Sequence, residues 1–192
     1  MNSAQAAQAL VSKYESKGVS SVEFREEHTI LAPAAAAKDI LSYAKAELDF
    51  DFLVDVSSLD HMGDDSKPRY EVVYHVYSYS SGAHLRLRSP LDEDEPEIAT
   101  VVDLWPTADW HEREVFDMMG IKFTDHPDLR RILMWEGYPF YPLRKDFPLA
   151  GRESDMPDVA FSDRAPLEGG PFVTAPSDAS VVHREPRSKD FE

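Results

Sequence analysis

The chain has 192 residues, of which 42% are hydrophobic and 11% aromatic, enough for one folded domain with a core and an appendage. Its formal net charge of −16 argues against a nucleic-acid binder, which needs a basic face, and against direct docking on anionic lipid headgroups. The absence of cysteine excludes disulfides and removes the thiolates that iron–sulfur clusters and most structural zinc sites require.

No stretch of the sequence approaches the roughly 18 consecutive apolar residues of a membrane-spanning helix. The N-terminus lacks the basic start and the apolar core of a signal peptide. We therefore expect a protein without a direct membrane span that stays in the cytoplasm.

The first third of the chain alternates helical and extended patterns. An alanine-rich segment with a helical repeat ends at Gly18, a residue type that commonly terminates helices. Pro33 begins a second helical pattern at a position where its missing N–H costs nothing. The predicted elements are a helix over residues 3–17, one or two strands over 22–31, a helix over 33–47, a strand over 52–56 and a turn over 62–68.

The middle of the chain predicts a β-hairpin. Residues 70–79 alternate between two faces, residues 80–82 are a turn signal, and residues 84–88 supply the returning strand. The acidic run at 92–95 is predicted to be a solvated loop, and residues 98–104 a further strand-like piece.

This order of elements predicts an α+β fold. We expect two layers, a mixed β-sheet of about four or five strands with helices packed on it, plus an extended C-terminal arm. Residues 1–150 are expected to form the α/β domain, and residues 151–192 a separate tail.

The segment from Trp110 to Phe147 combines charged pairs, aromatics and turn signals in one run. Its first third predicts a helix with Thr107 or Asp109 as N-cap. Gly120 is expected to supply the left-handed residue at which this helix ends.

Glu112 is the unusual residue of this helix, because it lies on the apolar side of the helical wheel. A buried carboxylate needs a cation or several N–H groups, and Arg130 and Arg131 are the nearest cations in the sequence. We therefore expect a small, mostly buried group of ion pairs, in which Arg113 and Asp117, four residues apart, are close enough to pair, while the pairing of each carboxylate with a particular arginine stays open. The alternative is an ordinary solvated helix whose surface pairs contribute about 0–1 kcal/mol each.

The character of the sequence changes at Tyr138. Proline alternates with aromatic residues over residues 138–148, which excludes a helix or an interior strand there. Residues 151–192 are rich in proline, aspartate, serine and glycine, and alone they should be extended or disordered. We expect this tail to become ordered by docking on partner subunits.

The helix carries residue types that metal and acid–base chemistry use, but not at the usual spacing. His111 and Glu112 match the start of a zinc-protease helix, yet the second histidine of that motif is missing. A metal held by His111, Glu114 and His126 is one alternative. Acid–base chemistry by Glu112, Glu114 and Asp117 is another, although the interleaved arginines favour structural ion pairs.

The run EREVFDMMGIKFTDHPDLRRIL resembles the signature of the 30-kDa subunit of respiratory complex I, the C subunit of bacterial NADH-quinone oxidoreductase. The flanking segments DLWPTADW and PLRKDFPL also resemble that family's surroundings. The N-terminal half is similar only in its order of elements and its length. The matching signature positions are Glu112-Arg113-Glu114, Asp117, Met118-Met119, His126, Arg130 and Ile132-Leu133.

This resemblance implies a non-catalytic structural subunit in the peripheral arm of a proton-translocating NADH:quinone oxidoreductase, a translocase at the cytoplasmic face of the bacterial inner membrane. It implies no cofactor in this chain, since FMN, iron–sulfur clusters and quinone belong to partner subunits. The implied partners are other peripheral-arm subunits, especially the large quinone-site subunit and the subunit with the terminal iron–sulfur cluster. The residues implied to serve the fold and the interface are Glu112, Arg113, Glu114, Asp117, His126, Arg130 and Arg131.

Two other functions stay open. Within the same superfamily, the chain resembles the equivalent subunit of a membrane-bound hydrogenase or formate hydrogenlyase complex. Outside it, a stand-alone hydrolase or metal enzyme would use the two histidines and the glutamate named above.

Overall fold

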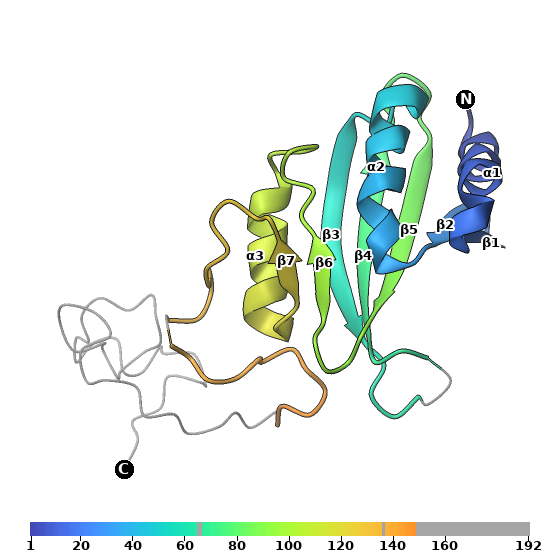
Figure 1. Cartoon of the computed structure of the whole chain (residues 1–192). Coiled ribbons are helices and arrows are strands. Elements are labelled where there is room, and N and C mark those ends of the chain that lie inside the picture. The colour runs from blue at the N-terminus through green and yellow to red at the C-terminus, as the bar shows by residue number, and fades with distance from the viewer. Residues whose placement is uncertain (65–66, 136, 149–192) are drawn as a thin grey trace, which may run out of the picture. The chain divides into compact units, whose positions relative to one another are not determined.

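The computed structural model describes residues 1–64, 67–135 and 137–148 of the chain (Figure 1). A five-stranded sheet in the order β1-β2-β5-β4-β3 forms its centre, and β6 and β7 form a small second sheet. The helices are α1 (Ser3–Tyr14), η1 (Glu15–Lys17, a 3-10 turn), α2 (Ala34–Leu48) and α3 (Ala108–Met119). The strands are β1 (Ser20–Phe24), β2 (Glu27–Leu31), β3 (Phe52–Asp60), β4 (Tyr70–Tyr77), β5 (His84–Leu91), β6 (Glu97–Ala99) and β7 (Lys122–Thr124).

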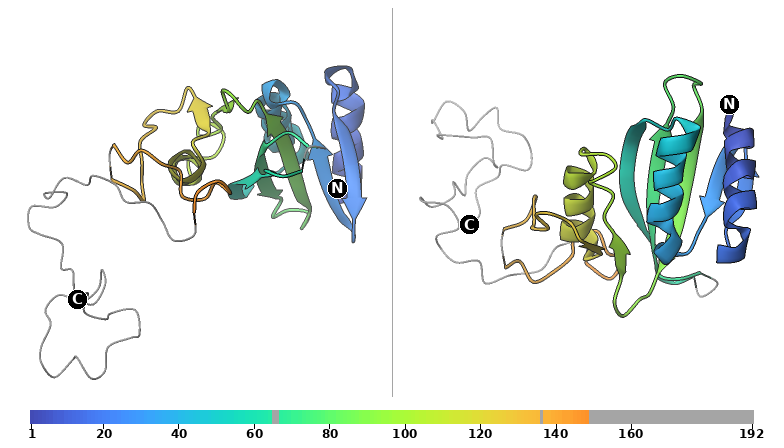
Figure 2. Two further views of the ribbon diagram at one scale, coloured as in Figure 1. Left: turned by 90° about the horizontal axis from the view of Figure 1, so that it is seen from below. Right: turned by 45° about the horizontal axis from the view of Figure 1, so that its top comes forward.

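The two N-terminal helices form for reasons visible in the sequence. Asn2 and Gln5 make a capping box at the start of α1, and Gly18 closes η1 with φ 74°. Pro33 precedes the first turn of α2, which ends at a left-handed Asp49. Both helices lie on the same face of the five-stranded sheet, which buries their alanine and leucine side chains (Figures 1 and 2).

Strand β4 is an interior strand of the sheet, next to the edge strand β3. It pairs antiparallel with β3 and β5, while β2 runs parallel to β5, so the sheet is mixed. The strand predicted over residues 70–79 is confirmed as β4, and the side chains of one face are all buried, although Glu71 and Val73 of the other face are buried as well. The residues of the fully buried face are Tyr70, Val72, Tyr74, Val76 and, just after the strand, Ser78.

The small sheet differs from the prediction. The expected strand over residues 98–104 is wrong in length, since β6 ends at Ala99 and the chain then turns through Val102–Leu104 toward α3. Strand β7, which pairs parallel with β6 after α3, was not predicted. A three-residue strand carries too few alternations to stand out from a loop.

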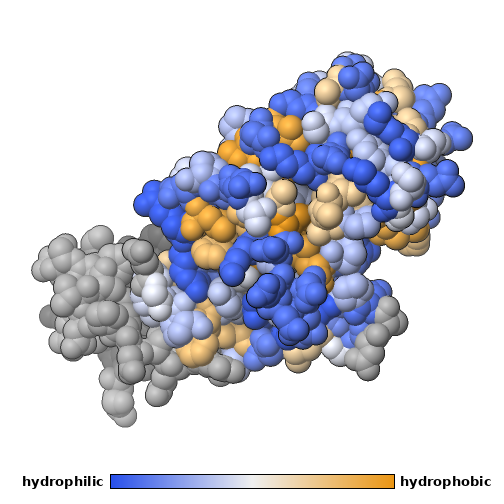
Figure 3. All heavy atoms as spheres, in the orientation of Figure 1, coloured by the Kyte–Doolittle hydropathy of each residue, from blue (hydrophilic) through white to orange (hydrophobic). Residues whose placement is uncertain are grey.

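The predicted α+β class, with a mixed sheet of four or five strands and helices packed on it, is confirmed. The predicted C-terminal arm lies outside the described residues. Within those residues, no helix has both the length and the apolar character needed to cross a membrane. On the face shown in Figure 3, hydrophilic residues dominate and apolar residues form small patches near the middle.

Candidate functional site around helix α3

Helix α3 carries the signature residues, and its ends are set by the local sequence. Thr107 occupies the N-cap position, but its side chain makes no capping hydrogen bond, so the predicted side-chain cap is wrong. Asp109 instead lies in the first turn, where its charge favours the helix dipole. The predicted end is confirmed: Gly120 has φ 75° and donates its N–H to the carbonyl of Phe116 at 2.9 Å.

Glu112 is completely buried, as the helical wheel predicts. Its Oε1 accepts the backbone N–H of Val101 at 2.8 Å, and its Oε2 accepts the hydroxyl of Thr100. Burial raises the pKa of Glu112 to about 7, and these two hydrogen bonds only partly offset that rise. The predicted pairing with Arg130 or Arg131 is wrong, because the partners come from the loop after β6.

His126 lies beside Glu112, and its side chain is also completely buried. Its Nδ1 accepts the backbone N–H of Asp128 at 3.0 Å, so the neutral ring carries its proton on Nε2. Nε2 is 3.4 Å from an oxygen of Asp109 and 3.9 Å from Oε2 of Glu112, without a well-aligned hydrogen bond to either. Two signature residues distant in sequence therefore meet inside the domain.

Asp117 holds the backbone that follows β7. Its Oδ2 accepts three consecutive N–H groups, at 3.0, 2.7 and 2.8 Å, and the carboxylate is completely buried. Its Oδ1 binds the guanidinium of Arg131 at 2.6 Å. Burial by itself would raise the pKa of Asp117, but these hydrogen bonds together lower it below its usual value. The three donors are Ile132, Leu133 and Met134.

The predicted pair between Arg113 and Asp117 is wrong. Arg113 donates instead to the carbonyl oxygens of Arg130 and Arg131, at 3.2 and 3.5 Å, and lies 4.0 Å from Asp109. Its guanidinium is mostly buried, whereas the side chain of Arg130 is 70% exposed and, among the described residues, forms an ion pair with nearby Asp128 alone. The four-residue spacing would allow Arg113 to pair with Asp117, but the chain that returns over α3 supplies the carbonyl oxygens to which Arg113 donates instead.

Arg131 extends the same network into the proline-aromatic part of the chain, here called the exit segment (residues 130–135 and 137–147). Besides Asp117, its guanidinium donates to the carbonyl oxygens of Tyr138 at 2.6 Å and Phe140 at 3.4 Å. This one side chain thus satisfies two backbone carbonyl groups of a segment without regular secondary structure.

Arg144, which no sequence motif singled out, makes a second attachment of the exit segment. Its Nε donates to the carbonyl of Met119 at 2.7 Å, at the end of α3. Its guanidinium lies 5.1 Å from the ring centre of Tyr70 and 4.3 Å from that of Tyr141. The signals in the sequence for this role were its place within an aromatic run and within the flanking segment PLRKDFPL.

A third attachment joins the exit segment to the main sheet. The guanidinium of Arg69 contacts both Asp60, at the end of β3, and Asp146, at 3.4 and 2.7 Å. The backbone N–H of Lys145 donates to the second oxygen of Asp60 at 2.8 Å. The exit segment is therefore fastened to α3 and to β3 along its length.

The remaining candidate residues do not converge on one point. Glu114 is exposed, and His111 pairs with Asp55 of β3 at 3.2 Å, so neither joins His126 in a metal site. Within the described part of the chain, no group of three or more potential ligands could hold a metal ion. The three carboxylates proposed for acid–base chemistry likewise point in different directions, since Glu112 and Asp117 have separate buried partners.

The fold and this site define a small α+β domain whose signature residues hold its own backbone in place. Residues 30–153 match the family described as "Respiratory-chain NADH dehydrogenase, 30 Kd subunit", and the chain belongs to this family. The predicted family is thereby confirmed. Its relatives are subunits of NADH-quinone oxidoreductase, an oxidoreductase complex.

Individual relatives cover most of the domain. The C subunit of NADH-quinone oxidoreductase from Geotalea uraniireducens is 41% identical over 143 residues, covering 74% of this chain and 86% of the relative. The C 2 subunit of the enzyme from Rhizobium meliloti is 46% identical over 134 residues, covering 67% of this chain and 72% of the relative. Among solved structures, the trypsin-resistant fragment (1-134) of Nqo5 is 30% identical with a TM-score of 0.58, covering 65% of this chain and 99% of the fragment.

A chain of the membrane-bound sulfane sulfur reductase, an archaeal respiratory membrane complex, shares the fold. Its TM-score is 0.63, and the match covers 76% of this chain and 85% of that one. At 24% identity, this likeness concerns the fold alone.

Proposed function

We propose that this chain is a non-catalytic structural subunit in the peripheral arm of a proton-translocating NADH:quinone oxidoreductase. In this proposal electrons pass from NADH through FMN and iron–sulfur clusters to quinone within other subunits. Membership of the family and the names of the relatives support the assignment to the complex.

The observation that carries the non-catalytic role is the use made of Asp117 and Arg131. Both residues direct their hydrogen bonds to main-chain atoms of the exit segment and to each other. A catalytic side chain needs a polar atom that can reach a substrate. A structural anchor instead uses its hydrogen-bonding atoms on the segment that it holds. The signature is therefore a device that fixes the start of the C-terminal region.

The C-terminal region then docks on the partners. Residues 151–192 would lose about 1–2 kcal/mol of backbone entropy per residue on ordering, a cost that burial on a partner can offset. The proposed partners are the large quinone-site subunit and the subunit with the terminal iron–sulfur cluster. The proposed location is the cytoplasmic face of the bacterial inner membrane, reached through the complex.

The test compares the full chain with a chain that ends at Gly151, each tagged at its N-terminus and expressed in place of the native subunit. We expect the full chain to co-purify with NADH-quinone oxidoreductase subunits and the shortened chain to be folded but poorly retained. Equal retention of both chains would contradict the role of the C-terminal region. Absence of the complex from both preparations would contradict the assignment itself.

The fold shared with the archaeal respiratory complex leaves a second candidate. This is the equivalent subunit of a membrane-bound hydrogenase or formate hydrogenlyase complex. The same co-purification separates the two, because a large subunit that binds nickel would identify a hydrogenase, and a nickel-free quinone-site subunit would identify the quinone enzyme.

A further inference from the structure

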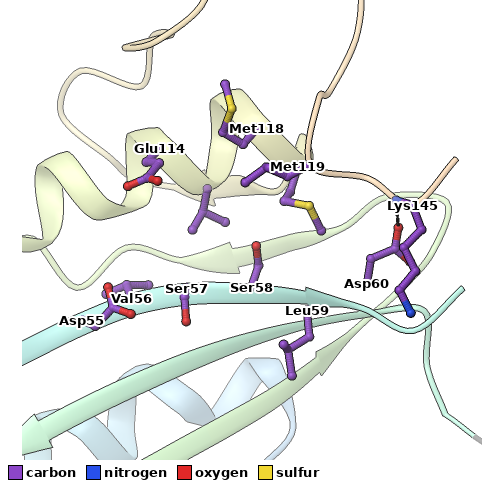
Figure 4. Close-up of a pocket in the computed structure, with 12 residues that line it drawn as sticks. Asp55, Val56, Ser57, Ser58, Leu59, Asp60, Glu114, Met118, Met119 and Lys145 are labelled. Atoms are coloured by element: carbon purple, nitrogen blue, oxygen red, sulfur yellow. Dashed lines mark hydrogen bonds between the residues drawn. The ribbon is translucent and has the colours of Figure 1, made fainter. Parts of the chain in front are cut away.

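A groove of about 480 Å³ runs between strand β3 and helix α3. Six consecutive residues of β3, 55–60, line the groove. Because successive side chains of a strand point to opposite faces of the sheet, this lining places the groove along the length of the strand and not over one face. The opposite wall is α3, and the exit segment adds Leu143 and Lys145 to the lining, with Lys145 beside Asp60 in Figure 4. In Figure 4 the side chain of Ser58 rises from β3 toward α3, and Met119 reaches from the end of α3 toward the strand.

Strand β3 is an edge strand of the five-stranded sheet. It pairs with β4 on one side only, and in the described residues no backbone partner lies along its outer side. Unpaired N–H and C=O groups on such an edge are a template for an added strand. The opposite edge strand, β1, also borders a pocket, of about 300 Å³ and walled by α1, but that lining carries serine, glutamine, glutamate and histidine side chains and no methionine.

The side chains in the groove define what it would accept. Val115, Met118 and Met119 supply an apolar wall, and methionine adapts to side chains of different shapes. Leu143 of the exit segment is 61% exposed, and Leu59 on the strand is 39% exposed. Apolar side chains at alternate positions of an extended segment would cover this surface.

The charges in the groove favour a basic residue at one end. Glu114 is exposed and makes no hydrogen bond or ion pair with any described residue. At the other end the carboxylate of Asp60 is already used by Arg69 and by the backbone of Lys145. A lysine or arginine would therefore find its free partner at Glu114.

We propose that this groove binds an extended segment of a neighbouring subunit. The segment adds as a strand to β3, places apolar side chains against Val115 and Met119, and pairs a lysine or arginine with Glu114. This inference rests on the proposed function, because the neighbouring subunit is one of the same oxidoreductase complex.

The absence of native cysteine makes a direct test possible. Ser58→Cys places one thiol in the groove, and Ser21→Cys places one on β1 as the matched control at the other edge of the sheet. A bulky maleimide is applied to the full chain, free and in the purified complex. We expect the Ser58→Cys thiol to react about tenfold more slowly in the complex than in the free chain, while the Ser21→Cys thiol changes little.

A photo-crosslinker on the Ser58→Cys thiol identifies the occupant. We expect the crosslinked peptide in the complex to come from another subunit and to carry alternating apolar residues with a lysine or arginine. Equal reactivity in the free chain and the complex overturns the proposal. A crosslink to residues 149–192 of the same chain, or to a second copy, also overturns it.

Substitution of Glu114 tests the charge without altering the core. Glu114→Lys should lower retention of the subunit in the complex by about tenfold, whereas Glu47→Lys, an exposed glutamate on α2, should leave it unchanged. Unchanged retention with Glu114→Lys contradicts the proposed ion pair. If the unsubstituted chain does not enter the complex, the proposed function is wrong. If it enters the complex but the groove stays accessible to the maleimide, only the proposed binding of a segment in the groove is wrong.

Discussion

Asp117 and Arg131 are 14 residues apart, and their side chains meet at 2.6 Å beneath the exit segment. The aspartate is completely buried, and only 14% of the arginine side chain is exposed. Both groups therefore lost most of their hydration on folding, and their remaining hydrogen bonds go to backbone atoms. This arrangement makes the pair a structural anchor whose two halves depend on each other.

Removing one half of this anchor should be costly. Asp117→Ala leaves the guanidinium of Arg131 without its carboxylate partner and three backbone N–H groups without an acceptor, so we expect a loss of about 3–5 kcal/mol in the free energy of unfolding. Urea unfolding of the full chain, followed by tryptophan fluorescence, measures this. The control is Asp128→Ala, which breaks an exposed pair with Arg130 and should cost about 0–1 kcal/mol. Equal losses in the two variants would mean that Asp117 is not an anchor.

Glu112 should make stability fall as the pH rises. Its pKa is about 7 in the folded chain against 4.5 for the ordinary carboxyl group. Between these values the folded state binds more protons than the unfolded state, so the free energy of unfolding decreases with pH. The contribution is fully present below about pH 4.5 and is lost as the pH rises through about 7.

The substitution Glu112→Gln isolates this effect. Glutamine keeps the shape and can still accept the N–H of Val101, but it does not titrate. We expect the stability difference between the two chains to change by roughly 3 kcal/mol between pH 5 and pH 8, with the wild type losing more. Parallel pH profiles for the two proteins would show that Glu112 does not change its protonation state on folding.

The sequence predicted the parts of the fold that rest on local patterns. The alternation of residues 70–79 predicted β4, and Gly18 and Gly120 marked two helix ends, because these signals act within a few residues. The five-stranded sheet followed from the count of such segments. Strand β7 was missed because its three residues are ordered by β6 rather than by their own pattern.

The sequence identified the residues of the site but not which of them form hydrogen bonds or ion pairs with one another. The helical wheel placed Glu112 in the core, since burial follows from periodicity alone. The partners of Glu112 lie in the loop before α3, and those of Asp117 lie in the chain that returns over α3; no spacing within the helix encodes either set. The four-residue distance between Arg113 and Asp117 favoured a pair that the structure does not contain.

Arg144 should require a guanidinium and not only a positive charge. It donates to the carbonyl of Met119 while its guanidinium lies near the rings of Tyr70 and Tyr141, and lysine cannot reproduce both contacts. We expect Arg144→Lys to lower the free energy of unfolding by about 1–3 kcal/mol. Arg25→Lys, which alters an exposed arginine over Phe24, should change it by less than about 0.5 kcal/mol. If the two variants are equally stable, the stacking around Arg144 contributes nothing.

Gly120 should tolerate no side chain, for two separable reasons. Its φ of 75° costs any other residue about 1–2 kcal/mol. In addition, a Cβ atom there would lie 2.6 Å from Nη2 of Arg144 and 2.7 Å from Cζ of Tyr141, so the exit segment would have to move. Gly18 has φ 74° with no neighbour within 4 Å, which makes Gly18→Ala a control for the backbone term alone.

We expect Gly18→Ala to cost about 1–2 kcal/mol and Gly120→Ala about 2–5 kcal/mol, because overpacking adds to the strain. Denaturant unfolding of the two variants measures the difference directly. Gly120→Ala should cost less in an Arg144→Ala background than in the wild type, since the second substitution removes one of the colliding groups. Equal losses for the two glycines, with the same cost of Gly120→Ala in both backgrounds, would show that the exit segment does not press against the end of α3.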